Sequence, residues 1–370
     1  MKYRTLGKTG LKVSEIGIGT WQLADDLNCW VGADLKESLQ SLYRYAELGG
    51  NFIDSAWIYG YSDTDDRHRS HELIAQFLKE SGLRDKLVIA SKVPPKNMQW
   101  PAFKNMPISE IFPDDWIVKC VDDSLRSLGI ETLDLMQFHV WQDDFTDEDG
   151  WKETIRKLTA AGKVRHWGIS ANDYQPSNCF RAIETGLISS IQFILNIFHQ
   201  RPAEKLLPFA AKHNIGLIAR VPLDEGGLTG KFTVDTRFAV GDFRRHYFSP
   251  DRLKELIART DNLKTLLNGE AGSLVELSLR YLLSLPEVSS AIPGMRRISH
   301  VESNNAVSDG RLLSDRLMSE LKKHAWERNF NTSPLHTSTL PWSRNPFCLS
   351  QTARSSPASP CELTCSNFCF

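Results

Sequence analysis

Eight short apolar segments recur along the chain, and a stretch with helical periodicity follows each of them. They are Glu15–Ile18, Asn51–Asp54, Leu87–Lys92, Leu133–Phe138, Val164–Ile169, Ile191–Leu195, Ile215–Ala219 and Val288–Ile292. Continuous apolar character is typical of strands that are buried on both faces of a parallel sheet. A doubly wound sheet usually has fewer strands and a glycine-rich turn after the first, and no GxGxxG motif follows Glu15–Ile18. The pattern therefore predicts an α/β protein with a (β/α)8 TIM barrel.

The segments between the predicted strands read as amphipathic helices. In the range Pro113–Leu128, apolar residues recur at spacings of three and four, namely Val118, Val121, Leu125 and Leu128. Pro113 followed by two aspartates is a favourable helix start. A second helix is predicted over Asp34–Leu48, and Gly49 after it is expected to adopt the left-handed conformation that ends many helices.

Two further segments lie outside this repeat. Tyr3–Val13, with Lys8–Gly10 near its centre, is predicted to form an N-terminal β-hairpin that plugs the bottom of the barrel. A long loop, Pro222–Pro250, follows the seventh predicted strand, and an extra helix is expected over Asp251–Leu267. Long loops at the C-terminal face of a barrel carry binding function, so we expect part of the functional site there.

The composition of this 370-residue chain limits the classes of partner. The formal net charge of −1 gives no overall field that would recruit nucleic acid or an anionic membrane. No apolar run approaches the roughly 18 residues of a spanning helix, and no apolar segment follows the N-terminus as in a secretory signal. Before residue 340, the cysteines Cys29, Cys120 and Cys179 show no metal-type spacing. We therefore expect a cytoplasmic protein with reduced thiols, no nucleic-acid partner and no membrane association.

Five motifs carry a resemblance to a known family. They are Arg4–Ser14, Gly17–Trp21, Asn51–Gly60, Ile89–Lys92 and Leu133–His139. Each motif is weak evidence alone, but together and in this order they resemble the aldo-keto reductases, of bacterial type, over residues 1–330. The resemblance implies an oxidoreductase that transfers a hydride between NADP(H) and a small-molecule carbonyl substrate, such as an aldehyde, a ketone or a sugar.

The resemblance also implies four catalytic residues, Asp54, Tyr59, Lys92 and His139. Hydride delivered to a carbonyl carbon leaves an alkoxide-like oxygen that needs a proton. A tyrosine hydroxyl, with a free pKa of about 10, is a weak donor near neutral pH, and an ammonium beside it favours the tyrosinate. The family pattern makes Tyr59 the general acid, Lys92 and Asp54 its tuning pair, and His139 the group that orients the substrate oxygen. Each residue alone has a structural explanation such as capping or packing, but the joint pattern favours catalysis.

A second set of residues is implied to bind the cofactor. It comprises Thr20, Trp21, Asp54, Ser170, Asn172, Gln192, Arg220, Pro222, Leu223, Gly227, Lys231, Gly294, Arg296, His300 and Asn304. Ser170, Asn172 and Gln192 correspond to residues that bind the nicotinamide carboxamide, since together they offer donors and acceptors. The loop with Gly227 resembles the segment that covers the pyrophosphate. Arg296 is expected to bind the 2′-phosphate, which favours NADPH over NADH.

Two positions near the expected cofactor site depart from the family pattern. Ala171 stands where family members often have asparagine, so Asn172 is the candidate to replace it. Arg220 stands where the family has an aromatic residue that stacks on the nicotinamide. A planar guanidinium is able to stack on a ring, and it also suits a phosphate or a polar substrate. Arg297 is the second candidate for the 2′-phosphate.

The substrate pocket is expected to have aromatic walls from Trp21, Trp57 and Trp141, which suit a partly apolar carbonyl compound or a sugar face. One alternative function is an NADPH-binding regulatory module with little turnover, as in channel-associated barrel subunits. A metal-dependent hydrolase or isomerase is the other. It needs more ligands than His139 with Asp54, so no metal is expected. We expect a monomer or a weak homo-oligomer.

The end of the chain has a different character. Residues 331–370 are rich in Ser, Thr and Pro and contain Cys348, Cys361, Cys365 and Cys369. This composition predicts a disordered tail after a barrel domain of residues 1–330. Because Trp326–Phe330 resembles a chain end in the family, a frame-shifted or read-through extension is the alternative interpretation.

Overall fold

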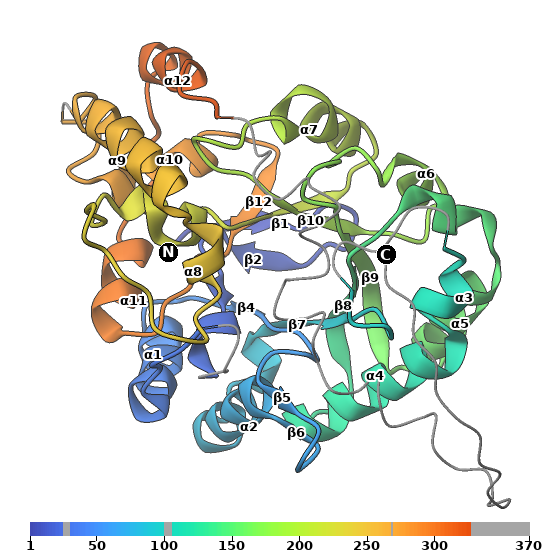
Figure 1. Ribbon diagram of the computed structural model, residues 1–370. Coiled ribbons are helices and arrows are strands. Elements are labelled where there is room, and N and C mark those ends of the chain that lie inside the picture. Colours follow the sequence, from blue (N-terminus) through green and yellow to red (C-terminus); the bar gives the residue numbers. More distant parts are fainter. Residues whose placement is uncertain (25–29, 100–105, 268, 327–370) are drawn as a thin grey trace, which may run out of the picture.

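The central feature of the fold is an eight-stranded parallel sheet that curls into a barrel (Figure 1). The computed structural model describes residues 1–24, 30–99, 106–267 and 269–326. The strands are β3 (Ile18–Gly19), β4 (Phe52–Asp54), β7 (Val88–Val93), β8 (Leu133–His139), β9 (Val164–Ser170), β10 (Ser190–Ile194), β11 (Gly216–Arg220) and β12 (Val288–Ala291). They follow one another around the sheet in chain order, each parallel to the next. The predicted α/β barrel is confirmed.

The barrel closes between its first and last strands. Ile16 pairs in parallel with Ala291, and the amide of Gly17 donates to the carbonyl of Ala291 at 2.8 Å. Ala291 in turn donates to the carbonyl of Glu15 at 2.9 Å. The regular part of the first strand begins only at Ile18, later than the predicted Glu15–Ile18, because the preceding residues are held by these isolated bridges.

The N-terminal hairpin closes the bottom of the barrel, as predicted. Its strands are β1 (Tyr3–Thr5) and β2 (Lys12–Ser14), which pair antiparallel. Its residues Leu6 and Val13 join a buried cluster with inward-facing side chains of the barrel, namely Phe52, Val88, Ala90, Leu135, Ile218 and Ile292. The Arg4 guanidinium donates to the carbonyls of Leu283, Leu285 and Val288 at 2.5–3.1 Å, so it ties the hairpin to the last βα unit.

Helices surround the sheet (Figure 1). They are α1 (Leu35–Glu47), α2 (Arg69–Ser81), α3 (Ile108–Ile111), α4 (Asp114–Leu128), α5 (Gly150–Ala160), α6 (Phe180–Glu184), α7 (Pro202–Lys212), α8 (Arg244–Tyr247), α9 (Pro250–Lys264), α10 (Leu274–Leu283), α11 (Ile298–Asn305) and α12 (Asp315–Lys322). None of the helices in the described residues combines the length and apolar character that crossing a bilayer requires.

The predicted helix ends are present. The Asp34 carboxylate accepts a hydrogen bond from the amide of Glu37 at the start of α1. Gly49 after this helix has φ +84°, a conformation that suits glycine. One expectation for α4 is wrong, because Val118 is 37% exposed while Ile117 and Cys120 are buried in its place. Val121 and Leu128 are buried as predicted, so only part of the core-facing stripe differs.

The long connection after β11 is folded. It contains the 3-10 segment η4 (Asp224–Thr229) and α8, and the predicted extra helix after it is α9. The buried Asp224 carboxylate accepts hydrogen bonds from Tyr247 at 2.5 Å and from Arg252 at 3.4 Å. Asp224 therefore fastens η4 to α8 and α9, which fixes the loop over the barrel mouth. The predicted tail, with its four cysteines, and also Cys29 lie outside the described residues.

Candidate active site

Four buried polar residues occupy the barrel interior above the apolar plug. Successive side chains of a strand alternate between its faces, so residues two apart share a face. Asp54 follows Phe52 on β4 in this way, Lys92 follows Ala90 on β7, and Gln137 follows Leu135 on β8. Gln192 on β10 completes the set, and all four are at most 2% exposed. We call Asp54, Lys92, Gln137 and Gln192 the polar layer.

Lys92 is the centre of the polar layer. Its Nζ donates to Asp54 Oδ2 at 2.6 Å and to the carbonyl of Ser55 at 2.7 Å, and it lies 3.3 Å from the Tyr59 hydroxyl. Burial lowers the pKa of Lys92, and the ion pair with Asp54 opposes this effect. The structure thus brings three of the predicted catalytic residues into one hydrogen-bonded group.

The second oxygen of Asp54 is also occupied. Its Oδ1 accepts from Gln192 Nε2 at 2.7 Å and from Gln137 Nε2 at 3.3 Å. These hydrogen bonds, together with the one from Lys92 to Oδ2, hold the carboxylate in place beside the ammonium. Sequence reasoning missed Gln137, although its position two residues before His139 on the same strand face is a signal that would have found it.

Tyr59 and His139 meet above the polar layer. Tyr59 lies in the turn after β4, where its amide donates to the carbonyl of Ala56 at 3.0 Å. Its ring is 6.3 Å from the His139 ring, at an interplanar angle of 89°, and 6.0 Å from the ring of Trp21. Burial and the positive charges of Lys92 and Arg220 hold the pKa of His139 well below its usual value. The imidazole is therefore neutral around pH 7 and suits a hydrogen-bonding role.

Arg220 lies at the end of β11 beside these groups. One of its guanidinium nitrogens, Nη2, donates to the carbonyl of Ala171 at 3.3 Å and forms an ion pair with Asp173. It connects the ends of β9 and β11 across β10.

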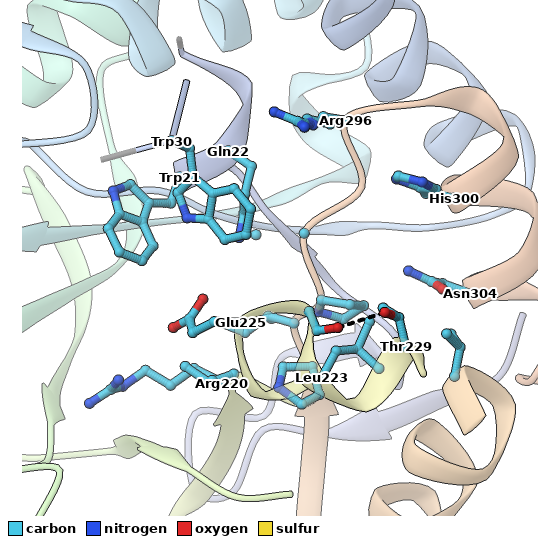
Figure 2. A pocket seen from close by; sticks show the side chains of 18 of the residues that line it. Trp21, Gln22, Trp30, Arg220, Leu223, Glu225, Thr229, Arg296, His300 and Asn304 are labelled. Carbon is cyan, nitrogen blue, oxygen red and sulfur yellow. Dashed lines mark hydrogen bonds between the residues drawn. The ribbon is translucent and has the colours of Figure 1, made fainter. Parts of the chain in front are cut away.

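A single cavity of about 1000 Å³ runs from this end of the barrel along η4 to α11 (Figure 2). Of the predicted site residues, Thr20, Trp21, Asp54, Tyr59, His139, Gln192, Arg220, Pro222, Leu223, Lys231, Gly294, Arg296, His300 and Asn304 line it. Figure 2 shows Arg220 and Glu225 extending toward one end, with Arg296, His300 and Asn304 at the other. The cavity thus connects the catalytic candidates to the far cationic end.

The far end of the cavity concentrates positive charge. Burial and the charges of Arg297, Lys231 and Arg296 all lower the pKa of His300, in that order. Arg296 donates to the carbonyl of Val31 at 3.2 Å and so connects the last barrel loop to the loop after β3. A cluster of cations facing a cavity is suited to phosphate groups.

Gly294 lies in a closely packed part of the cavity wall. A Cβ added at this position would lie 2.4 Å from Cδ of Gln22, whose side chain also lines the cavity. Only glycine fits here without displacing that glutamine.

Three predicted cofactor residues are not part of the cavity wall. Ser170 is fully buried at the end of β9. The Asn172 side chain accepts a hydrogen bond from the amide of Tyr174 at 2.9 Å, so its oxygen stabilises its own loop. Gly227 is a buried residue of η4, and the neighbouring Gly226 lines the cavity in its place. These three residues lie outside the cavity wall, and their contact with the cofactor stays a prediction.

Two predicted pocket walls belong to the core. The Trp57 indole donates to Asp123 Oδ2 at 3.1 Å and packs 4.2 Å from the ring of Tyr61. Trp141 is fully buried and packs 4.9 Å from the ring of Trp151. Both pack against the helices and lie outside the wall of the cavity, so their assignment to the substrate pocket stays a prediction.

Phe243 and Arg244, which the sequence did not indicate, belong to the wall of the cavity beside Trp21 and Trp30. The Phe243 ring lies 4.8 Å from that of Trp21 and 5.4 Å from that of Trp30. The Arg244 guanidinium lies 4.1 Å from the centroid of Trp30, within the range of a cation–π contact. The loop after β3 and the helix α8 therefore meet across the cavity, and Figure 2 shows both indoles on its wall.

Among the described residues, no group of three or more His, Cys, Asp or Glu side chains is arranged to hold a metal ion.

The geometry agrees with a comparison to known families. A model described as the aldo/keto reductase family matches residues 15–325. The chain belongs to the aldo/keto reductase family. The barrel of this oxidoreductase family member is also similar to solved structures. The glycerol dehydrogenase AKR11B4 from Gluconobacter oxydans superposes with a TM-score of 0.70 at 27% identity, and the match covers 87% of this chain and 94% of that one.

Curated relatives of this aldo/keto reductase fall into two groups. Aldo-keto reductase YhdN of Bacillus subtilis is 30% identical over 85% of this chain and 91% of its own length. Aldo-keto reductase yakc of Schizosaccharomyces pombe, whose name specifies NADP(+), is 28% identical over 80% of this chain and 85% of its own. A probable voltage-gated potassium channel subunit beta of Arabidopsis thaliana is 27% identical over 84% and 92%.

Proposed function

We propose that this aldo/keto reductase reduces a small-molecule carbonyl compound with NADPH, and that Tyr59 donates the proton. The observation that carries the proposal is the contact of one buried ammonium, Lys92 Nζ, with both Asp54 and the Tyr59 hydroxyl at the end of the cavity. When bound, NADPH supplies a hydride to the carbonyl carbon. Tyr59 then protonates the oxygen, and the Lys92 ammonium stabilises the tyrosinate that remains.

The cavity fits NADPH in size and in charge. Its volume of about 1000 Å³ suits a long ligand, and its cationic end is distant from its reactive end. Arg296 and Lys231 would hold phosphate groups at the cationic end. Gln192 and Thr20 line the reactive end, where polar groups of the nicotinamide would need partners. The NADP(+) specification in the name of the Schizosaccharomyces pombe relative supports the same choice.

His139 would orient the substrate. Its neutral ring, 6.3 Å from the ring of Tyr59, is able to donate one hydrogen bond to a carbonyl oxygen that also meets the tyrosine hydroxyl. Two donors that converge on one oxygen stabilise the negative charge that develops there.

A regulatory module with little turnover is the second candidate, because a potassium channel subunit is among the relatives. The complete set of Asp54, Tyr59, Lys92 and His139 favours the enzyme over this alternative. Turnover distinguishes the two.

The test is the oxidation of NADPH by purified protein in the presence of aldehydes, ketones and sugars. We expect turnover with NADPH, less with NADH, and a loss of about 10²–10⁴-fold in kcat in Tyr59→Phe. Tyr61→Phe is the matched control, because this tyrosine packs on Trp57 and is not part of the cavity wall. Tight NADPH binding without turnover on any substrate would favour the regulatory module, and equal activity of Tyr59→Phe would exclude this tyrosine as the acid.

A further inference from the structure

Arg220 places a charge at the reactive end of the cavity that the proposed mechanism does not use. It is the last residue of β11, and it lies two residues after the inward-facing Ile218. Its Nη2 donates to the carbonyl of Ala171, the residue after Ser170, and Ser170 is the register partner of His139. The guanidinium therefore reaches the strand end next to His139.

The charge of Arg220 acts on the catalytic candidates. It lowers the pKa of both Lys92 and His139, and at His139 its effect exceeds the opposing effect of Asp173. Its own side chain is 18% exposed and that of Asp173 is 31% exposed, so solvent screens the positive partner less. Glu225 extends toward the same end of the cavity, where its carboxylate opposes the positive charge of Arg220 (Figure 2).

The two redox forms of a nicotinamide differ in charge. The reduced ring is neutral and the oxidised ring carries one positive charge. Hydride transfer to a carbonyl at Tyr59 requires the ring to occupy the end of the cavity that Arg220 also lines. A fixed positive charge there leaves the neutral form unaffected and repels the charged one.

We propose that Arg220 is a positioning residue that selects the redox state of the cofactor, because it weakens the binding of NADP⁺ relative to NADPH. This proposal rests on the proposed function. An uncharged aromatic residue, which the family resemblance implies at this position, lacks this effect. In this protein, Arg220 therefore favours release of the oxidised cofactor after reduction and disfavours alcohol oxidation, for which NADP⁺ must bind first.

The experiment is calorimetric titration of the purified protein with NADPH and with NADP⁺ at pH 7.5 and low salt. The quantity compared is the ratio of Kd for NADP⁺ to Kd for NADPH. Contacts that are common to both forms cancel in this ratio, so it reports the effect of charge. We expect Arg220→Gln to lower the ratio by roughly three- to tenfold, the size of a partly screened interaction between two charges.

Two further variants separate charge from shape. Arg220→Lys keeps the charge and should keep the ratio close to that of the unaltered protein. Asp173→Asn removes the counter-charge and should raise the ratio, opposite to Arg220→Gln. Circular dichroism melting curves establish that each variant is folded.

The outcomes are distinct. A ratio that is unchanged or raised in a folded Arg220→Gln variant overturns the role of Arg220 while the proposed function stands. The role is likewise overturned if Arg220→Lys behaves like Arg220→Gln, because shape rather than charge would then be responsible. If the unaltered protein binds neither cofactor form, the proposed function itself fails, and the inference fails with it.

Discussion

Lys92 Nζ lies 2.6 Å from Asp54 Oδ2, and both side chains are enclosed by the barrel, at 0% and 3% exposure. An ion pair in this position gains no support from solvent. Its charges are held by each other, by the carbonyl of Ser55 and by the amides of Gln137 and Gln192. The arrangement costs desolvation energy, which a purely structural core would avoid. A buried charge that contacts Tyr59 suits the proton transfer that we propose for this tyrosine.

This pair is expected to be strongly coupled. Lys92→Met leaves the Asp54 carboxylate buried without its cation and should lower the free energy of unfolding by about 3–5 kcal/mol. Asp54→Asn combined with Lys92→Met removes both charges, so the double variant should be more stable than Lys92→Met alone. Urea unfolding followed by circular dichroism measures the stability of Lys92→Met, of Asp54→Asn and of the double variant. Simple addition of the two single effects would show that the charges do not stabilise each other.

Acid is expected to destabilise the fold through His71. This residue of α2 is fully buried between the hydroxyls of Ser91 and Ser127, and burial lowers its pKa to about 3. In the unfolded chain, with a histidine pKa near 6.5, this side chain binds a proton at a pH at which it stays neutral in the folded chain. Stability should therefore fall as the pH drops from about 6.5 toward 3, by about 1.4 kcal/mol per pH unit for this group.

The variant His71→Gln tests this pH dependence. It should be less stable than the unaltered protein at pH 7, and its unfolding free energy should decline less steeply between pH 6 and pH 4. His246→Gln is the control, because it removes a histidine that is exposed. Equal slopes in His71→Gln and the unaltered protein would contradict the prediction.

Replacement of Trp21 is expected to change substrate preference, whereas replacement of Trp141 is expected to lower stability. Trp21 lines the cavity 6.0 Å from the Tyr59 ring, so Trp21→Leu should change kcat/KM for bulky relative to small carbonyl substrates by tenfold or more, about the range for lost pocket contacts. Trp141→Leu should keep the ratio and lower the free energy of unfolding by about 3 kcal/mol. A changed substrate ratio in Trp141→Leu would return this residue to the pocket.

Binding of the 2′-phosphate of NADPH is expected to depend on Arg296. Replacement by alanine removes charge-assisted hydrogen bonds worth about 1.5–3 kcal/mol, so Kd for NADPH should rise about 10- to 100-fold while Kd for NADH stays the same. Arg297→Ala is the comparison, since this arginine is 58% exposed and faces Glu37 at 3.9 Å. A larger loss in Arg297→Ala would transfer the role to that residue.

Periodicity in the sequence accounts for the strand-borne part of the site and does not account for the loop-borne part. Asp54, Lys92 and Gln192 lie on strands, where alternation dictates which side chains point inward. Trp57 and Trp141 follow strand ends, where the loop backbone decides the direction and no periodicity predicts it. Both indoles therefore lie outside the cavity wall.

The sequence did not predict the contact between Trp30 and Phe243 for a similar reason. Trp30 and Phe243 belong to loops more than two hundred positions apart, so their contact follows from the closure of the barrel and leaves no local pattern. Asn172 illustrates a third limit, since a polar side chain in a turn satisfies its own backbone before it serves a ligand.

The contact of Arg4 with the carbonyl of Val288 joins residues 284 positions apart. A ribosome adds about 5–20 residues each second, so the N-terminal strand waits roughly 15–60 s for its neighbour to be made. During that interval the nascent sheet carries an open edge, the feature through which unfinished chains aggregate. A chain that stops before β12 leaves that edge open, so closure of the whole sheet depends on the last strand to be made.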